Sequence, residues 1–300
     1  MERVQLAEGL SFSRLVHGHW RLADWSLRPE QILELVEYDL ELGISTLDHA
    51  DIYGNYSCEA LFGQALALKP ELRSQIELVT KCGIMLRSDE RPAHKLKHYD
   101  TSHAHIIASV ESSLSNLQTD YIDLLLIHRP DPLMNPSEIA EAFAKLKQEG
   151  KVRSFGVSNF TPAQFNMLQS YLDIPLVTNQ IEISAATPEP FLDGSLDHCL
   201  ERRILPMAWS PLAGGQLFQP DNLKFQGLLS AVSRVAEELE ADSIDQVLYA
   251  WLLHHPARIL PIIGSGNKDR IAAAAASLRL QLSRQQWFEI WQASLGHEVS

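Results

Sequence analysis

Acidic, phenolic, ammonium and imidazole side chains follow three apolar segments of this sequence, each near the point where the segment ends. One segment closes on Asp48 and is followed shortly by Tyr53, a second closes on Lys81, and a third closes on His128. These four groups are typical participants in proton transfer. Because a buried lysine or aspartate is costly when it stands alone, we expect Asp48 to lie beside Lys81, with Tyr53 close by.

The composition sets limits on the class of protein. The chain has 300 residues, of which 45% are apolar, so it can bury a large core. Its formal net charge of −13 argues against nucleic acid or an anionic membrane surface as a partner. The three cysteines are sparse and lack CxxC spacing, which favours a reducing compartment. We find no signal peptide and no membrane-spanning run, and we therefore expect a cytoplasmic protein.

Short apolar runs alternate with stretches of helical period along the chain. The expected strands are Arg14–His17, Ser45–Asp48, Ile76–Lys81, Ile122–His128, Val152–Val157, Leu176–Ile181, Leu205–Trp209 and Ile259–Ile263. The expected helices between them are Gln31–Leu42, His105–Leu117, Ser137–Gln148, Pro162–Tyr171, Glu189–Arg202, Leu228–Leu239 and Lys268–Leu278. Alternation of this kind predicts a parallel sheet with helical crossovers.

Eight such units with apolar strands favour an α/β fold, a closed (β/α)8 TIM barrel, in a single domain over residues 1–300. Apolar residues on both sides of Glu8-Gly9 predict an N-terminal β-hairpin that closes the barrel floor. Ser283–Leu295 predicts an extra C-terminal helix. An open doubly wound sheet is the alternative, but His17-Gly18-His19-Trp20 after the first strand is not a GxGxxG turn.

In a barrel of this kind the working residues sit at the C-terminal ends of the strands. Polar or aromatic residues follow the later strands too, namely Ser158-Asn159, Gln180, Trp209-Ser210 and Gly264-Ser265-Gly266-Asn267. A single polar strand end is usually an ordinary loop residue. Their recurrence at successive strand ends predicts a functional site there.

Several ordered segments of the sequence resemble the signature segments of the aldo/keto reductases. These segments are Thr46–Gly54, Val79–Gly83, Leu124–Asp131, Gly156–Phe160, Asn179-Gln180, Trp209-Ser210-Pro211-Leu212 and Ile263–Arg270. They run through nearly the whole chain. Lys81-Cys82-Gly83 and His128-Arg129-Pro130-Asp131 are most similar to the bacterial oxidoreductase branch, which is also similar to the potassium-channel β-subunits.

The resemblance implies a catalytic tetrad of Asp48, Tyr53, Lys81 and His128. Tyr53 would protonate a substrate carbonyl while a nicotinamide cofactor supplies hydride, and His128 would orient that carbonyl. A phenol has a pKa near 10, and we expect the Lys81 ammonium, held by Asp48, to lower it. The implied substrate is a small aldehyde or ketone, and the implied protein is a monomer or a weak homo-oligomer.

The resemblance also implies NADP(H) as the cofactor. Ser158, Asn159 and Gln180 would bind the carboxamide and Trp209 would stack on the ring. The turn from Ser210 to Gly215 would wrap the pyrophosphate with backbone N–H groups. Ser265, Asn267 and Arg270, at the start of the last barrel helix, would bind a 2′-phosphate. The full expected cofactor set is Gly18, Trp20, Ser158, Asn159, Gln180, Trp209, Ser210, Pro211, Leu212, Gly214, Gly215, Gly264, Ser265, Asn267 and Arg270.

The sequence departs from the family pattern in two places. Gly18-His19 stands where many members have Gly-Thr, and Ala273-Ala274 stands where adenine is often held by Glu-Asn. We therefore expect adenine contacts that are weaker or differently made. The long Met85–Thr101 insert, which carries charges and histidines, is a candidate lid or a solvated loop.

Two other functions fit parts of the sequence. An NADP(H)-binding regulatory or sensor subunit with little turnover would use the same nicotinamide site, and steady-state oxidation of NADPH separates it from an enzyme. A metal-dependent barrel hydrolase would use His17 and His19 as a His-x-His pair. It would also need histidines at the ends of the fifth and sixth strands and an aspartate at the end of the eighth, which are missing, so we expect no metal.

Overall fold

The computed structural model describes residues 1–219 and 223–300. Within these residues the strands and helices alternate as expected, and they group into two compact units, Met1–Asn179 and Gln180–Ser300. The single domain expected over residues 1–300 stays a prediction.

The first unit contains most of the strands. Its strands are β1 (Arg3–Ala7), β2 (Leu10–Ser13), β3 (Val16–Gly18), β4 (Thr46–Asp48), β5 (Glu77–Cys82), β6 (Ile84–Met85), β7 (His98–Tyr99), β8 (Ile122–Ile127) and β9 (Val152–Ser158), and β10 (Leu176–Glu182) crosses the boundary. Its helices are α1 (Pro29–Glu41), α2 (Tyr53–Tyr56), α3 (Cys58–Ala67), η1 (Pro70–Gln75), α4 (His103–Leu117), α5 (Pro136–Gln148) and α6 (Pro162–Gln169).

The second unit is mainly helical. Its strands are β11 (Met207–Trp209) and β12 (Leu260–Ile263). Its helices are η2 (Glu189–Phe191), α7 (Ser195–Arg202), η3 (Ala213–Phe218), η4 (Leu223–Phe225), α8 (Gln226–Glu238), α9 (Ile244–Leu253), α10 (Lys268–Ala276), η5 (Ser277–Arg279) and α11 (Arg284–Leu295).

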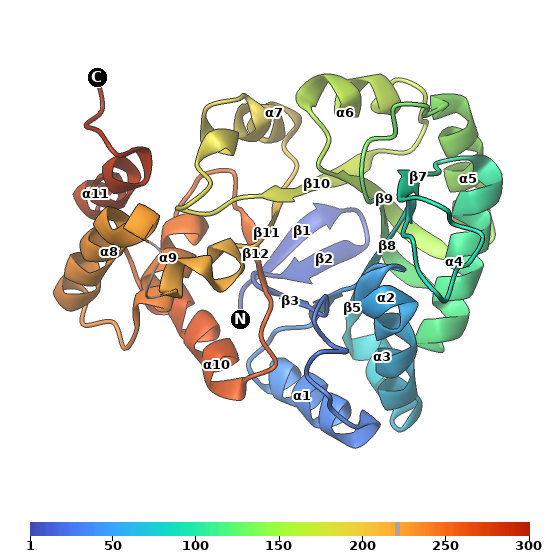
Figure 1. Cartoon of the computed structure of the whole chain (residues 1–300), viewed down its shortest axis with the longest axis horizontal. Coiled ribbons are helices and arrows are strands. Elements are labelled where there is room, and N and C mark those ends of the chain that lie inside the picture. The colour runs from blue at the N-terminus through green and yellow to red at the C-terminus, as the bar shows by residue number, and fades with distance from the viewer. Residues whose placement is uncertain (220–222) are drawn as a thin grey trace. The chain divides into compact units, whose positions relative to one another are not determined.

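Within the described residues, eight parallel strands close into a barrel in the order β10-β11-β12-β3-β4-β5-β8-β9. The expected (β/α)8 barrel is therefore confirmed. Every residue of β8 is buried, which is typical of a parallel strand covered on both faces. Figure 1 shows α3, α4 and α5 following one another around the outside of β5, β8 and β9.

The N-terminal hairpin β1–β2 is confirmed, and it binds the starts of two strands in the first unit. The Arg3 guanidinium donates to the Ser45 hydroxyl at 2.6 Å and pairs with the Glu77 carboxylate at 2.6 Å. The Ser13 hydroxyl accepts from the backbone N–H groups of Ser45 and Thr46, each at 3.1 Å. The hairpin thus lies at the end of β4 and β5 opposite to Asp48 and Lys81.

Most expected helices form within a few residues of their expected bounds because the sequence contains capping residues at their ends. The Thr161 hydroxyl accepts from the Gln164 N–H, and Pro162 takes the first helical position of α6. The prediction of one long helix over Glu189–Arg202 is wrong. It is split into η2 and α7 because Gly194 takes a left-handed conformation, with φ 85° and ψ 1°.

Besides the short α2, the helices α3 and α9 were not expected from the sequence. In α9 every residue from Gln246 to Leu252 is buried, so the helix has no polar face to mark its period. Helix α3 is also rich in apolar residues and buries Phe62, Ala65 and Leu66 among others. An amphipathic pattern fails where tertiary packing covers a helix on all sides.

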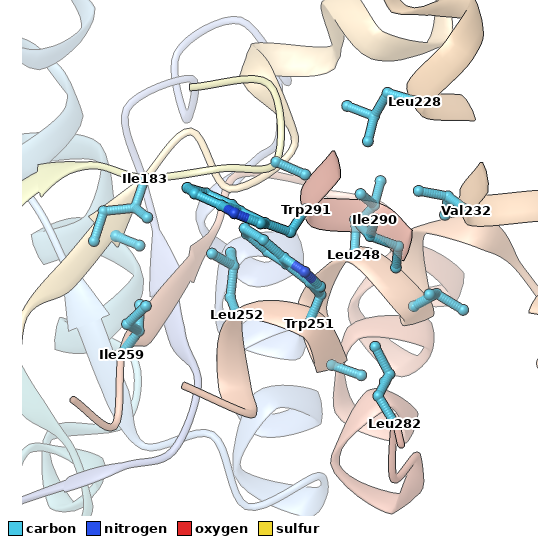
Figure 2. Packing of buried hydrophobic residues seen from close by; sticks show 14 of the residues in the cluster. Ile183, Leu228, Val232, Leu248, Trp251, Leu252, Ile259, Leu282, Ile290 and Trp291 are labelled. Atoms are coloured by element: carbon cyan, nitrogen blue, oxygen red, sulfur yellow. The ribbon is translucent and has the colours of Figure 1, made fainter. Parts of the chain in front are cut away.

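The extra C-terminal helix α11 is confirmed, and it packs on α8 and α9 in the second unit. The indole N–H of Trp251 donates to the carbonyl of Trp287, and that of Trp287 donates to the carbonyl of Trp251, each at 3.1 Å. The two rings stack with centroids 5.0 Å apart. Figure 2 shows Trp251 and Trp291 side by side in this cluster, with Leu248 and Ile290.

Candidate active site

Lys81 and Asp48 form a buried ion pair where β5 and β4 end. The Lys81 ammonium lies 2.8 Å from each carboxylate oxygen of Asp48 and donates to the carbonyl of His49 at 2.7 Å. Both side chains are almost fully shielded from solvent. Since a buried cation is tolerated only when it is paired and hydrogen-bonded, these oxygens hold the ammonium at one point.

Tyr53 completes the coordination of that ammonium. Its hydroxyl oxygen lies 3.1 Å from the Lys81 nitrogen, and the centre of its ring lies 4.9 Å from it. The structure therefore brings Asp48, Lys81 and Tyr53 together, as expected from the sequence.

An unusual turn places Tyr53. Three successive residues, Gly54, Asn55 and Tyr56, have positive φ values of 57°, 56° and 71°. A side chain at Gly54 would put its Cβ 2.5 Å from the sulfur of Cys58. The turn therefore needs glycine at this position for both its conformation and its packing.

His128, directly after β8, faces Tyr53. The two rings meet edge to face with centroids 5.9 Å apart. Burial lowers the pKa of His128 well below its ordinary value, and the nearby charges of Lys81, Arg129 and Lys97 act in the same direction. Its Nδ1 atom is buried and has no hydrogen-bond partner among the described residues. The imidazole is therefore neutral at neutral pH and offers one N–H.

The expectation that the pKa of Tyr53 lies below its ordinary value is wrong. Burial raises the pKa of Tyr53 above its ordinary value, and this effect outweighs the Lys81 ammonium, which lowers it. Burial also disfavours the charged form of Lys81, but the Asp48 carboxylate and Tyr53 raise its pKa above the ordinary value. The ammonium thus stays charged and the phenol stays protonated, which is the state a proton donor needs.

The remaining expected residues of the first unit lie at the ends of β3 and β9. Gly18 is the last residue of β3 and is paired in register with Asp48, while the Trp20 side chain is 58% exposed. Ser158 ends β9, and Asn159 has a positive φ of 62°. The Asn159 amide donates to the Ser158 hydroxyl at 2.8 Å and to the His128 carbonyl at 3.3 Å. Ser158 and Asn159 are therefore tied to the segment that carries His128.

In the second unit, the loop after β11 contains four left-handed residues. Ser210, Ala213, Gly214 and Gly215 all have positive φ, with values of 51°, 51°, 62° and 89°. Such residues cluster at ligand sites. The N–H groups of Ala213 and Gly215 already donate to the carbonyls of Ser210 and Leu212 at 2.8 and 2.9 Å. The other expected residues of this unit are Gln180 in β10, Trp209 at the end of β11, and Pro211 and Leu212 in the loop.

The start of α10 differs in one respect from the expected phosphate site. The Asn267 side chain caps the helix, accepting from the N–H groups of Asp269 and Arg270 at 2.8 and 3.2 Å. Those two N–H groups are therefore already used within the helix cap. The exposed Arg270 guanidinium forms no ion pair with a described residue. The Ser265 hydroxyl, beside Gly264, accepts from the Asn267 N–H at 3.2 Å. Arg270 is the expected cation for a phosphate at this helix start.

The histidines of the first strand serve another purpose than the His-x-His pair of a hydrolase. His17 Nδ1 lies 2.6 Å from the Asp39 carboxylate. The His19 ring stacks on His49 with centroids 4.5 Å apart. Among the described residues no group of three or more His, Cys, Asp or Glu side chains is arranged to hold a metal ion. Nor does this part of the chain contain a helix long and apolar enough to cross a bilayer.

Two contributors to the site were not expected. The backbone carbonyl of His49 holds Lys81, and no side-chain pattern signals a carbonyl. Tyr56 fixes the insert after β5, because its hydroxyl accepts from the backbone N–H of Leu86 at 2.8 Å. The proximity of Tyr56 to Tyr53 in the sequence was the available signal.

Comparison with known proteins identifies the class to which this fold and site belong. The model of the aldo/keto reductase family matches residues 14–294, and the chain belongs to this family.

Two proteins similar in sequence and one solved structure support this assignment. The chain is 58% identical to the "Uncharacterized oxidoreductase YcsN" of Bacillus subtilis (strain 168), over the full length of both chains. It is 45% identical, again over the full length of both, to a "6-dehydroglucose reductase" of Agrobacterium fabrum (strain C58). A solved aldo/keto reductase of Klebsiella pneumoniae, in complex with NADP and acetate, is 26% identical with a TM-score of 0.78, covering 96% of this chain and 93% of that one.

Proposed function

We propose that this chain reduces the carbonyl group of aldehydes or ketones to an alcohol with NADPH, and that Tyr53 is the proton donor. The observation that carries the proposal is the 3.1 Å contact between the Tyr53 hydroxyl and the Lys81 ammonium, which Asp48 and the His49 carbonyl hold in place. A hydroxyl fixed beside a permanent cation can give up its proton without leaving an unstabilised negative charge.

Each residue of the tetrad then has one task. The neutral His128 donates its N–H to the carbonyl oxygen of the substrate and orients it. Tyr53 transfers its hydroxyl proton to that oxygen, and Lys81 stabilises the phenolate that remains. Asp48 keeps Lys81 charged and in position. Since Lys81 and Asp48 are shielded from water, their electrostatic effect on the phenol is stronger than at a surface.

NADPH, when bound, supplies the hydride that reaches the carbonyl carbon. The Klebsiella pneumoniae relative in complex with NADP supports this choice of cofactor. We assign the nicotinamide end to Gly18, Trp20, Ser158, Asn159, Gln180 and Trp209, and the phosphates to residues 210–215, 264–267 and Arg270. The exposed guanidinium of Arg270, which forms no ion pair with a described residue, supports the phosphate assignment.

The test is steady-state oxidation of NADPH with a panel of carbonyl compounds. The relative named 6-dehydroglucose reductase makes 6-dehydroglucose a compound to include. Tyr53→Phe should lower kcat about 10²–10⁴-fold while the Kd for NADPH stays within twofold of that of the unmodified protein. Tyr171→Phe, at an exposed tyrosine, is the matched control and should behave like the unmodified protein.

Near-normal turnover by Tyr53→Phe would contradict the role of Tyr53. Tight NADPH binding without turnover of any carbonyl would instead favour the regulatory or sensor subunit.

A further inference from the structure

Two histidines near the β6–β7 ribbon, His94 and His98, share one hydrogen-bonding pattern. The Nδ1 atom of His94 lies 2.9 Å from the carbonyl oxygen of Leu86, and that of His98 lies 2.9 Å from the carbonyl oxygen of Leu96. Because a carbonyl oxygen can only accept a hydrogen bond, each Nδ1 atom carries the proton. The Nε2 atom of each neutral ring then keeps its lone pair.

This pattern is the one that metal-binding histidines show. A ligating imidazole usually donates its other N–H to a carbonyl or a carboxylate, which fixes the tautomer and the orientation of the ring. Imidazole nitrogen suits Zn²⁺, Cu²⁺ and Ni²⁺, whereas Mg²⁺ and Ca²⁺ prefer oxygen ligands. The tautomer of both rings therefore leaves Nε2 able to bind an ion of the first kind.

The distance between the two rings fits a shared ion. Their centres are 5.8 Å apart, and their planes meet at 84°. Two imidazoles that bind one Zn²⁺ ion at about 2.1 Å in tetrahedral geometry have ring centres roughly 5–6 Å apart. Two protein ligands leave the other positions of the ion to water, so the pair is compatible with the finding that the described residues contain no group of three or more ligands.

The backbone fixes the two histidines relative to each other. His98 begins β7 and pairs in register with Met85 of β6, while His94 binds the carbonyl of Leu86, the next residue along the chain. The Leu86 N–H in turn donates to the Tyr56 hydroxyl at 2.8 Å. Both rings are thus attached to adjacent residues of one segment, which reduces the conformational entropy that an ion would have to remove.

Two lysines between the histidines oppose the binding of a cation. Lys95 and Lys97 are both exposed, so water and salt screen their charges. Direct bonds from two imidazole nitrogens to one ion outweigh a screened repulsion of this kind.

We propose that His94 and His98 form a binding site for a divalent transition-metal ion, with Zn²⁺ as the test ion. Neither residue belongs to the tetrad or to the assigned cofactor groups, so the inference is independent of the proposed reductase function. A bound ion would close residues 94–98 into a ring and hold the insert more firmly against its base.

Calorimetric titration of the chelator-treated protein with Zn²⁺ tests the site directly. Since loss of even an outer partner of a ligand costs about 10–100-fold in metal affinity, His98→Gln should weaken Zn²⁺ binding at least about tenfold, and His94→Gln should match it. His297→Gln is the matched control, because His297 is exposed and its Nδ1 atom also meets a carbonyl, that of Glu298 at 2.8 Å. This control should leave the affinity unchanged.

Three calorimetric outcomes would overturn the proposal. The first is that the unmodified protein binds no Zn²⁺. The second is that His98→Gln and His297→Gln bind it equally well, which would place the ion elsewhere. The third is that Mg²⁺ binds as tightly as Zn²⁺ and loses as much affinity in His98→Gln, because imidazole ligands would not produce that result.

Trypsin gives a second readout, because Lys95 and Lys97 are exposed cleavage sites between the two histidines. At about ten times its Kd, Zn²⁺ should slow cleavage after these lysines by about tenfold in the unmodified protein and in His297→Gln. His98→Gln should be cleaved at one rate with and without Zn²⁺, which also controls for any effect of the ion on the protease. Unchanged cleavage in a protein that binds Zn²⁺ through His98 would show that the two histidines do not share the ion, and it would overturn the proposal.

Discussion

The Lys81 ammonium lies 2.8 Å from both carboxylate oxygens of Asp48 and 3.1 Å from the hydroxyl of Tyr53. One buried cation thus joins the Asp48 carboxylate to a phenol that carries charge only after it has lost its proton. Burial opposes the charge on Lys81, but Asp48 and Tyr53 raise its pKa above the ordinary value, so the cation is present at neutral pH.

Replacement of this cation should change the pH dependence of reduction. In Lys81→Met the ammonium that lowers the pKa of Tyr53 is gone, so the pKa of the phenol rises further. We expect kcat/KM to fall and its alkaline limb to move to higher pH. The pH–rate profile from neutral to strongly alkaline pH measures both effects, and a profile that matched the unmodified protein would refute the coupling.

Lys81→Met also leaves Asp48 buried without its partner, which costs about 3–5 kcal/mol of stability. The double variant Asp48→Asn/Lys81→Met removes both charges and serves as the control for folding. It should be more stable than Lys81→Met in urea unfolding and remain slow in reduction.

The turn after Tyr53 gives a second prediction. Gly54→Ala places a Cβ 2.5 Å from the Cys58 sulfur at a φ of 57°, so the turn must shift and take Tyr53 with it. We expect kcat to fall by about tenfold or more, together with a loss of about 1–3 kcal/mol of stability. Gly150→Ala is the matched control, since Gly150 has a φ of 71° but no atom within 4 Å of an added Cβ. Gly150→Ala should lower stability and leave kcat unchanged. An equal effect of both variants on kcat would contradict the positioning role of Gly54.

Cofactor choice gives a third prediction. The 2′-phosphate of NADPH is absent from NADH, so a guanidinium that binds it should discriminate between the two. A charge-assisted hydrogen bond contributes about 1.5–3 kcal/mol, which corresponds to about ten- to a hundredfold in affinity. Arg270→Ala should therefore weaken NADPH binding at least about tenfold and leave NADH almost unchanged. Fluorescence titration with both cofactors measures this, with Arg279→Ala, at another exposed arginine, as control. An equal loss for the two cofactors would rule out the phosphate contact.

A buried carboxyl near the site gives a fourth prediction, on stability. Burial raises the pKa of Asp51 from 3.8 to about 8, and the Glu59 carboxyl adds to this effect. The folded protein therefore binds this proton more tightly than the unfolded chain does. Its contribution to stability is fully present below about pH 4 and declines as the pH rises to about 8, by about 1.4 kcal/mol per pH unit.

Asp51→Asn should flatten this decline, because the amide keeps the contact with the Ser109 hydroxyl, which lies 2.9 Å from Asp51, and does not titrate. Urea unfolding at a series of pH values between 4 and 8 measures the slope. Asp89→Asn, at an exposed carboxylate, is the control and should keep the slope of the unmodified protein. Identical slopes for Asp51→Asn and the unmodified protein would show that Asp51 does not hold a proton in the folded state.

The sequence by itself determined the order of the barrel strands and of most helices between them. Apolar runs such as Ile122–Ile127 are buried on both faces, so their strand character is visible in composition alone. Caps such as Thr161-Pro162 are local, and the helices that they begin were predicted within a few residues. The ends of parallel strands meet at one edge of a barrel, and a buried lysine needs an anion, so Asp48 and Lys81 could be paired in advance.

Only the tertiary structure decided the features that depend on contacts between distant segments. The helix Ile244–Leu253 is apolar on all sides because other elements cover it, and no period in the sequence shows that. The pKa of Tyr53 depends on a balance between burial and the Lys81 charge, and burial prevails only because the surrounding chain excludes water. The insert after β5 is joined to the segment that carries Tyr53 because the Tyr56 hydroxyl accepts from the Leu86 N–H. Residue types and spacing fix local structure, whereas desolvation and long-range contacts arise only when the chain has folded.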